Sequence, residues 1–169
     1  IVADYNLPEE KVDLGNGLVA QAKGCKKFSV AATFHQEKDE TRTSDATLFA
    51  SDQLTVGITA DNYIFVNMGK GSKAKSVKSG NLFATADNWA LYSTGTSGDT
   101  HVTPITDATL TTTYDGATLR VYRNEVLELY IPCKGLKLKN VRCGNLSTNL
   151  QQWCRALNQD EVGALSNKR

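Results

Sequence analysis

The sequence has little that would mark a metalloprotein, a membrane protein or a nucleic-acid binder. It contains two histidines and no Cys-x-x-Cys pair, so it lacks the ligand spacing of a structural zinc site. The net charge is +1, which provides no overall field for nucleic acid or a membrane surface. No apolar run approaches the roughly 20 residues of a transmembrane helix. These features predict a soluble chain whose 169 residues suit one domain.

Several features favour an extracellular setting. The sequence begins at Ile1 with no basic start and apolar stretch, which predicts that a leader or neighbouring region has been removed. Asn145-Leu-Ser147 is a glycosylation sequon. An even set of cysteines favours two disulfides over four free thiols, and the set is Cys25, Cys133, Cys143 and Cys154. We therefore expect a secreted glycoprotein or a domain on the extracellular side of the cell surface.

Residues 110 to 122 carry the strongest local pattern. Two runs of β-branched and aromatic residues flank Asp115-Gly116, a pair that favours a type I′ turn with positive φ at both central residues. After the turn Ala117, Leu119 and Val121 alternate with polar side chains. This alternation predicts a half-buried antiparallel strand.

Other segments indicate an all-β protein. Strand-like runs occur at residues 17–22, 28–34, 47–50, 53–59, 63–68, 91–93, 126–132, 136–142 and 150–155. Residues 69–80 carry four lysines and few apolar side chains, which predicts a long mobile loop. At the end, Asn158 and Glu161 have the spacing of a capping box, and Leu157 and Val162 that of a hydrophobic staple.

Many strands and one short C-terminal helix predict an antiparallel two-sheet jelly-roll sandwich. We expect an extended lead-in over residues 1–16, a single domain over 17–166 and a tail over 167–169.

Three segments resemble the laminin G-like members of the concanavalin A-like jelly-roll superfamily. Thr112-Thr-Tyr-Asp-Gly-Ala-Thr-Leu-Arg-Val-Tyr-Arg-Asn124 resembles a family segment in which a Thr-Tyr-Asp-Gly turn leads into a strand ending Tyr-x-Asn-Gly. Residues 150–165 are similar to the closing strand and acidic helix start, and residues 48–58 to the early strands. The closing strand and helix also resemble the lectin-like module of parasite trans-sialidases. Glu125 replaces the family glycine, which predicts a longer turn or one of another type.

The resemblance has consequences for the cysteines and for metal binding. In such jelly rolls the N-terminal and closing strands lie together, which favours Cys25 with Cys154 and leaves Cys133 with Cys143. Cys143 with Cys154 is the main alternative. Laminin G-like domains often hold calcium between loop oxygens, and the loop acids able to supply ligands here are Asp52, Asp61 and Asp87. The alternative for each acid is a structural or solvating role.

Catalytic patterns are weak. Glycosidases of this superfamily carry Glu-x-Asp-x-Glu on one strand, whereas Glu37-Lys-Asp-Glu40 lies in a charged segment without strand character. Gly95-Thr-Ser-Gly98 lacks nucleophile-elbow spacing, and Gly69-Lys-Gly71 lacks the third glycine and the helix of a phosphate-binding loop. We therefore expect a non-catalytic protein. A small glycan-processing enzyme that uses Glu37 and Glu40 is the third hypothesis.

Two surfaces are candidates for ligand binding. One places aromatic rings beside polar groups, which suits stacking on a sugar ring, and consists of Asp87, Asn88, Trp89 and Tyr92. The other is a cationic cluster suited to sulfated or sialylated glycans, formed by Lys70, Lys73, Lys75 and Lys78. The alternatives are a core tryptophan and a solubilising loop.

These observations favour a recognition module that binds carbohydrate, with a glycan or cell-surface glycoprotein as partner and neither nucleic acid nor membrane insertion. A protein–protein adhesion domain of laminin G type is the second hypothesis.

Overall fold

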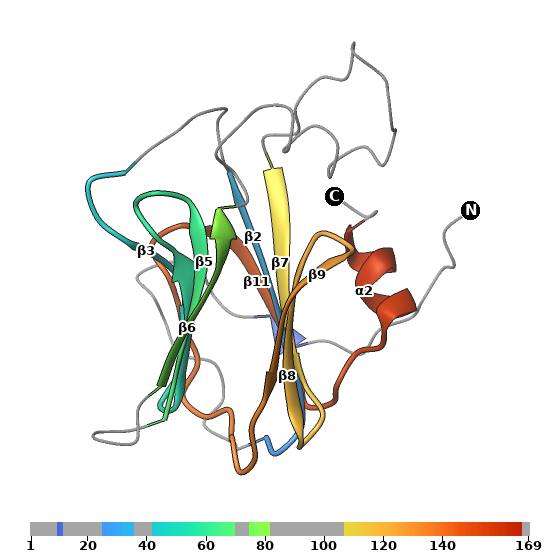
Figure 1. Ribbon diagram of the computed structural model, residues 1–169. Coiled ribbons are helices and arrows are strands. Elements are labelled where there is room, and N and C mark those ends of the chain that lie inside the picture. The colour runs from blue at the N-terminus through green and yellow to red at the C-terminus, as the bar shows by residue number, and fades with distance from the viewer. Residues whose placement is uncertain (1–9, 12–24, 36–41, 70–74, 82–106, 167–169) are drawn as a thin grey trace.

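The described strands form two antiparallel sheets that pack face to face (Figure 1). The computed structural model describes residues 10–11, 25–35, 42–69, 75–81 and 107–166. A six-stranded sheet has the order β1-β11-β2-β7-β8-β9, and a five-stranded sheet has the order β10-β3-β4-β5-β6. The all-β sandwich predicted from the sequence is confirmed.

The six-stranded sheet contains β1 (Glu10–Lys11), β2 (Phe28–His35), β7 (Asp107–Tyr114), β8 (Thr118–Arg123), β9 (Val126–Pro132) and β11 (Ser147–Trp153). The five-stranded sheet contains β3 (Ala46–Ala50), β4 (Leu54–Ile58), β5 (Tyr63–Met68), β6 (Lys75–Asn81) and β10 (Arg142–Cys143). Helix α2 (Gln159–Ser166) follows β11. No helix among the described residues is long and apolar enough to cross a bilayer.

The core lies between the sheets and follows the strand alternation. On β8, Leu119 and Val121 are fully buried, whereas Arg120 between them faces outward. Phe34 on β2 and Val66 on β5 fill the opposing layers. Each such side chain stabilises the fold by about 1.5–3 kcal/mol. The alternation predicted after the hairpin is therefore confirmed from Leu119 onward.

Helix α2 covers part of the outer face of the six-stranded sheet. Val162 and Leu165 of the helix cluster with Tyr122 and Trp153 from the strands. The predicted capping box is confirmed, because the Glu161 backbone N–H donates to Asn158 Oδ1 (2.9 Å) and the Asn158 N–H donates to Glu161 Oε1 (3.1 Å).

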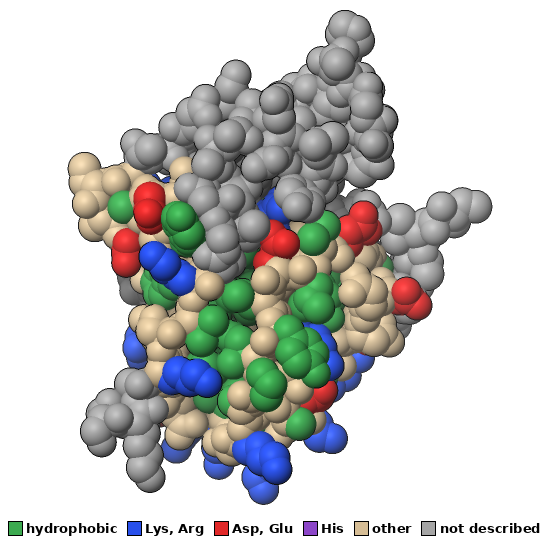
Figure 2. Space-filling model, viewed as in Figure 1, with side chains coloured by type: hydrophobic (Ala, Val, Ile, Leu, Met, Phe, Trp, Pro, Cys, Tyr) green, Lys and Arg blue, Asp and Glu red, His purple; other side chains and the backbone are tan. Residues whose placement is uncertain are grey.

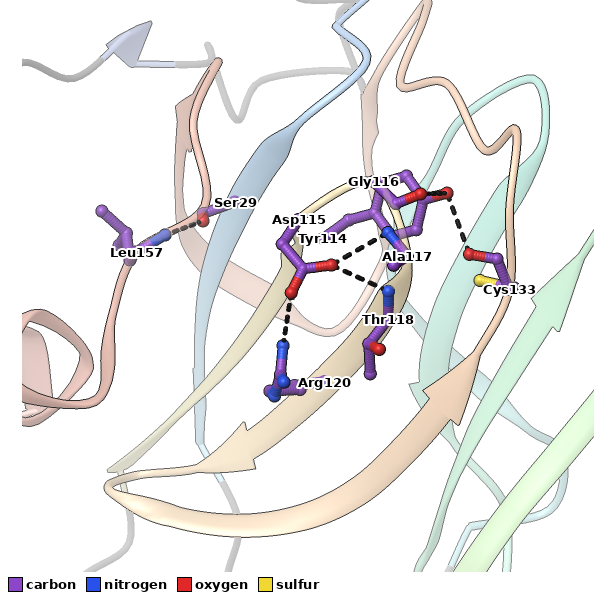
Figure 3. Close-up of polar contacts among 9 residues, drawn as sticks. All are labelled: Ser29, Tyr114, Asp115, Gly116, Ala117, Thr118, Arg120, Cys133 and Leu157. Carbon is purple, nitrogen blue, oxygen red and sulfur yellow. Dashed lines mark hydrogen bonds and ion pairs between the residues drawn. The ribbon is translucent and has the colours of Figure 1, made fainter.

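A buried serine fixes the segment that leads into α2. The Ser29 hydroxyl on β2 donates to the Arg155 carbonyl (2.8 Å). It also accepts from the Leu157 N–H (2.8 Å), a contact that Figure 3 shows. The Arg155 guanidinium also donates to both carboxylate oxygens of Glu161, at 3.1 and 2.7 Å. These contacts connect the start of the helix to β2, which lies far away in the sequence.

The first hairpin turn differs from its prediction. Gly116 takes positive φ (98°) but Asp115 does not, so the type I′ prediction is wrong. Instead, Asp115 Oδ1 accepts from the N–H groups of Ala117 (2.9 Å) and Thr118 (2.8 Å), as Figure 3 shows. Ala117 is also exposed rather than buried.

The next turn has two residues, because Arg123 pairs directly with Val126. Asn124 takes the positive φ (54°), which spares Glu125 that strain. The turn is thus of another type and not longer, which settles the two options left open by the sequence.

Two segment predictions need correction. Residues 75–81 form β6, whereas the sequence predicts a loop there. Val77 packs against the core, and among the described strands β6 pairs with β5 alone. An edge strand needs few apolar residues, because it has one neighbour and one buried face. The strand predicted over residues 136–142 is not formed as one strand: the segment contains an isolated bridge between Leu138 and Cys25, and its last residue, Arg142, begins β10. The strands predicted at residues 17–22 and 91–93 lie outside the described residues.

The cysteines follow the prediction in part. Cys25 and Cys154 form a disulfide with Cα atoms 5.4 Å apart, as predicted. The predicted Cys133–Cys143 bridge is wrong, because both residues are free thiols. Cys133 follows edge strand β9, whereas Cys143 lies in edge strand β10 of the other sheet. Burial raises the pKa of both thiols, and both pack against the core as small apolar side chains.

Candidate functional site

A polar pocket of about 370 Å³ opens on the outer face of the five-stranded sheet. We call it the outer-sheet pocket. Its lining comes from β5 and β6, from the segment before β3 and from the turn after β4, and consists of Asp45, Thr59, Asp61, Phe65, Asn67, Ser76 and Lys78. Strand alternation explains the set: Ile64 and Val66 point into the core, so Phe65 and Asn67 point outward.

Phe65 is the apolar element of the pocket, and Gly57 on β4 makes room for its ring. A Cβ at Gly57 would lie 2.6 and 2.7 Å from two ring atoms of Phe65, and 2.2 Å from the Ala46 carbonyl oxygen. Phe65 is 9% exposed and pairs in register with Lys78 of β6. The absence of a side chain at Gly57 thus lets the ring lie close against the sheet.

The turn between β4 and β5 holds the carboxylates at one end of the pocket. The Thr59 hydroxyl donates to Asp61 Oδ1 (2.6 Å) and accepts from the Tyr63 N–H (2.8 Å). Asp45 Oδ1 accepts from the Ala60 N–H (3.0 Å), which joins the segment before β3 to this turn. The Thr59 hydroxyl therefore holds Asp61 and the Ala60 N–H holds Asp45 before any ligand arrives.

The electrostatics favour an ionised Asp61. The hydrogen bond from the Thr59 hydroxyl lowers the pKa of Asp61, burial opposes it, and a backbone hydrogen bond and the charge of Lys78 lower it further. The Lys78 ammonium lies 4.6 Å from the centre of the Tyr63 ring, a cation–π contact. The pocket thus combines an aromatic ring with carboxylate, ammonium, amide and hydroxyl groups, which can hydrogen-bond a ligand rich in hydroxyls.

The structure brings some of the predicted site residues together. Lys78 and Asp61, assigned from the sequence to different sites, line the same pocket. Lys75 is two residues from Val77 and so lies on the same face of β6, which is not the face of Lys78. The charge of Lys75 acts on Cys133, where it partly offsets the rise in pKa caused by burial. Six predicted site residues lie outside the described part of the chain: Lys70, Lys73, Asp87, Asn88, Trp89 and Tyr92.

Two of the predicted calcium ligands, Asp52 and Asp61, are not neighbours. Asp52 lies in the turn before β4 and Asp61 in the turn after it, so the two occupy opposite ends of that strand. Asp52 Oδ2 accepts from the Asn140 side-chain amide (3.0 Å). The described residues contain no group of three or more His, Cys, Asp or Glu side chains able to hold a metal ion. A calcium site therefore stays a prediction that needs ligands beyond these two acids.

The sequon also stays a prediction. Asn145 is exposed in the loop between β10 and β11, and its Oδ1 accepts from the Thr47 N–H (2.9 Å). The Ser147 hydroxyl of the same sequon donates to the Leu48 carbonyl (2.6 Å).

The sequence could not identify most of the pocket. Phe65 and Asn67 alternate with apolar residues, which would have indicated an outward face for both. Ser76 and Asp45 give no such signal, because their place depends on the pairing of β5 with β6 and on the turn after β4.

No protein-family model and no curated protein matches the sequence. Among solved structures, the carbohydrate-binding module CBM40 of the Ruminococcus gnavus IT-sialidase, bound to α2,6-sialyllactose, superposes with a TM-score of 0.59 at 10% identity, covering 94% of this chain and 96% of that chain. The binding domain of botulinum neurotoxin DC in complex with rat synaptotagmin II gives a TM-score of 0.54 at 13% identity and covers 84% of this chain.

The chain spans only 35% of that neurotoxin structure. Trypanosoma rangeli sialidase gives a TM-score of 0.53 at 13% identity, with 83% of this chain and 22% of that chain covered. At these identities the similarity shows the fold, a β-sandwich that the carbohydrate-binding module shares over nearly its whole length.

Proposed function

We propose that this chain is a non-catalytic recognition module that binds carbohydrate through the outer-sheet pocket. The observation that supports the proposal is the composition of that pocket, in which the Phe65 ring shares the lining with polar side chains. Hydrogen bonds hold two of these side chains, Asp45 and Asp61. A sugar ring presents apolar C–H faces and a rim of hydroxyls, so it matches a site with one aromatic surface and several directional partners. The sialyllactose-binding module with the same fold supports the same class of ligand.

The chemistry of the pocket favours a hydroxyl-rich sugar over a strongly anionic one. Asp45 and Asp61 can accept hydrogen bonds from neighbouring hydroxyls, and Asn67 can both donate and accept. Lys78 supplies one positive charge against the two carboxylates. A ligand with one carboxylate can still be placed at Lys78, whereas a polysulfated chain would face net repulsion.

We further propose that the module acts outside the cell or at its surface. The Cys25–Cys154 disulfide supports an oxidising compartment. A glycan or a cell-surface glycoprotein is the proposed partner. The acids of the enzyme hypothesis, Glu37 and Glu40, lie outside the described residues, and loss of a glycan-processing activity on their replacement by Gln is the result that hypothesis needs.

A glycan array followed by calorimetry tests the proposal. We expect Asn67→Ala and Asp61→Asn to weaken binding of the best array ligand about tenfold, since a hydrogen bond to a charged group contributes about 1.5–3 kcal/mol. Asn149→Ala is the matched control, because Asn149 is an equally exposed strand asparagine on the other sheet. A flat signal across neutral, sialylated and sulfated glycans, or binding that both pocket variants leave unchanged, would overturn the proposal.

A further inference from the structure

A second pocket, of about 330 Å³, lies at the end of the sandwich formed by the β7–β8 turn. Tyr114 and Leu136 contribute its apolar wall, and Lys26, Lys27 and Lys137 form its rim. We call it the lysine-rimmed pocket. It is separate from the outer-sheet pocket, with which it shares no residue.

Fixed contacts hold the wall in place. The Tyr114 hydroxyl lies within hydrogen-bonding distance of the Gly116 (3.1 Å) and Cys133 (3.0 Å) carbonyls, which share its single proton, and it accepts from the Leu136 N–H (3.2 Å). Its ring lies 5.3 Å from the Phe28 ring, centre to centre. The wall is therefore part of the folded core and does not need a ligand to form (Figure 3).

The rim is strongly basic. All three rim lysines are exposed, as are Lys134 and Lys139 in the neighbouring loop. In Figure 2 Lys and Arg side chains gather toward this lower end, and most of the acids lie toward the upper end.

Two described carboxylates at this end, Asp115 and Asp52, have hydrogen-bond partners. Asp115 accepts from two backbone N–H groups and from Arg120 (3.0 Å), and Asp52 accepts from Asn140. The field at the mouth of the lysine-rimmed pocket is thus positive.

One lysine stem lies beside the turn at the mouth of the pocket. Lys27 Cε lies 3.8 Å from the point that a Cβ at Gly116 would occupy, so this stem lies across the β7–β8 turn. Such a stem presents methylene groups to the pocket and its ammonium to solvent. A ligand would therefore meet apolar surface inside and positive charge around it.

We propose that the lysine-rimmed pocket binds an acidic peptide segment of a protein partner, with one apolar side chain in the pocket and flanking carboxylates on the lysines. The apolar wall favours a hydrocarbon or aromatic side chain over a sugar, whose hydroxyls would lose hydrogen bonds to water without gaining partners. Charge complementarity assigns the flanking residues to Asp and Glu.

Other polyanions fit less well. Tyr114 is 1% exposed and packs on Phe28, which leaves too little of its ring to stack on a nucleobase, whereas an apolar side chain can also contact Leu136 and the lysine stems. The exposed large apolar side chains of the described residues, Leu127 and Tyr130, lie on β9 and do not line the pocket, so they do not support membrane insertion beside it.

Fluorescence anisotropy with a labelled ten-residue peptide of Asp and Glu around a central phenylalanine tests the proposal. We expect it to bind about tenfold more tightly than the same peptide with a central alanine, because the phenylalanine ring is buried. The combined replacement Lys26→Gln, Lys27→Gln and Lys137→Gln should weaken binding roughly tenfold to a hundredfold. Lys78→Gln removes one positive charge from the outer-sheet pocket, by the same type of replacement, and should leave peptide binding unchanged.

Four results would overturn the proposal. Equal binding of the phenylalanine and alanine peptides would show a diffuse anion site. Binding of heparin that is tighter than binding of the phenylalanine peptide, and that the triple variant abolishes, would assign the pocket to a sulfated glycan. A concentration-dependent dimer lost in the triple variant would assign it to a second copy of this chain. Absence of peptide binding would remove the site. None of these results bears on sugar binding in the outer-sheet pocket, so the two proposals fail separately.

Discussion

Replacing Gly57 by alanine is expected to damage both the fold and the outer-sheet pocket. The new Cβ would lie 2.2 Å from the Ala46 carbonyl oxygen and 2.6 Å from the Phe65 ring, and real Cβ contacts do not come that close. The ring can move, but the carbonyl belongs to the pairing of β3 with β4 and moves only with its strand. The substitution therefore forces a shift in the sheet.

The magnitude follows from two opposing effects. Overpacking of this kind lowers the free energy of unfolding by about 1–3 kcal/mol. Alanine also reduces the conformational entropy of the unfolded chain, which raises the free energy of unfolding by about 0.4–1 kcal/mol. The clash with backbone places the Gly57→Ala cost at the upper end, so we expect a net loss of about 2 kcal/mol. For a chain of this size that lowers the melting temperature by about 4–8 °C.

Thermal unfolding followed by circular dichroism measures this effect, with Gly163→Ala as the control. A Cβ at Gly163, in α2, would meet its nearest neighbour, Glu125 Oε2, at 3.6 Å, an ordinary contact. That variant should raise the melting temperature, since alanine favours a helix over glycine by up to about 1 kcal/mol. If Gly57→Ala matched Gly163→Ala, the close approach of β3 and β4 inferred here would be wrong.

A double variant separates the two clashes. Phe65→Leu removes the ring atoms nearest to the new Cβ but leaves the Ala46 carbonyl in place. In the Gly57→Ala background it should therefore restore part of the lost stability and none of the sugar binding. Full restoration would show that only the ring was in the way.

Three further predictions concern the rest of the fold. Reducing the Cys25–Cys154 disulfide, whose cysteines are 129 residues apart, should lower the free energy of unfolding by about 5 kcal/mol in the chain-entropy model, measured by denaturant titration; an unchanged midpoint would contradict it. The pKa of Asp115 is lowered to about 2 by backbone N–H groups and Arg120. Its contribution to stability is therefore complete above about pH 4 and should be lost as the pH falls toward 2. In acid unfolding scans, Asp115→Ala should reduce this loss of stability. Glu161→Ala should lower stability by about 1–2 kcal/mol and speed amide exchange in α2, because the helix loses its capping box and its ion pair with Arg155; unchanged exchange would show that packing alone holds the helix.

Local patterns predicted the elements that are stabilised by nearby residues. The capping box of Asn158 and Glu161 needs only a three-residue spacing, and the β7–β8 hairpin needs only alternation around a glycine. The exact turn escaped prediction because the Asp115 side chain, rather than a backbone preference, captures two N–H groups. Pattern reasoning does not show which of several local hydrogen bonds a side chain will make.

Predictions that depend on distant partners were less successful. Residues 75–81 form a strand because β5 provides a neighbour, although lysines and serines give the segment no strand signal. The loop between Cys133 and Cys143 joins an edge strand of one sheet to an edge strand of the other, which spacing in the sequence cannot reveal. For the same reason the sequence indicated Lys78 and Asp61 as candidate binding residues but did not show that both line one pocket with Phe65.

The Ser29 hydroxyl has a consequence for the order of folding. Its two hydrogen bonds reach residues more than 120 positions later in the chain, and they require β2 to be paired with β11. Closing so large a loop is slow, so α2 cannot dock until the sheet has assembled. The terminal helix should therefore be the last element to reach its native position and, on unfolding, the first to detach.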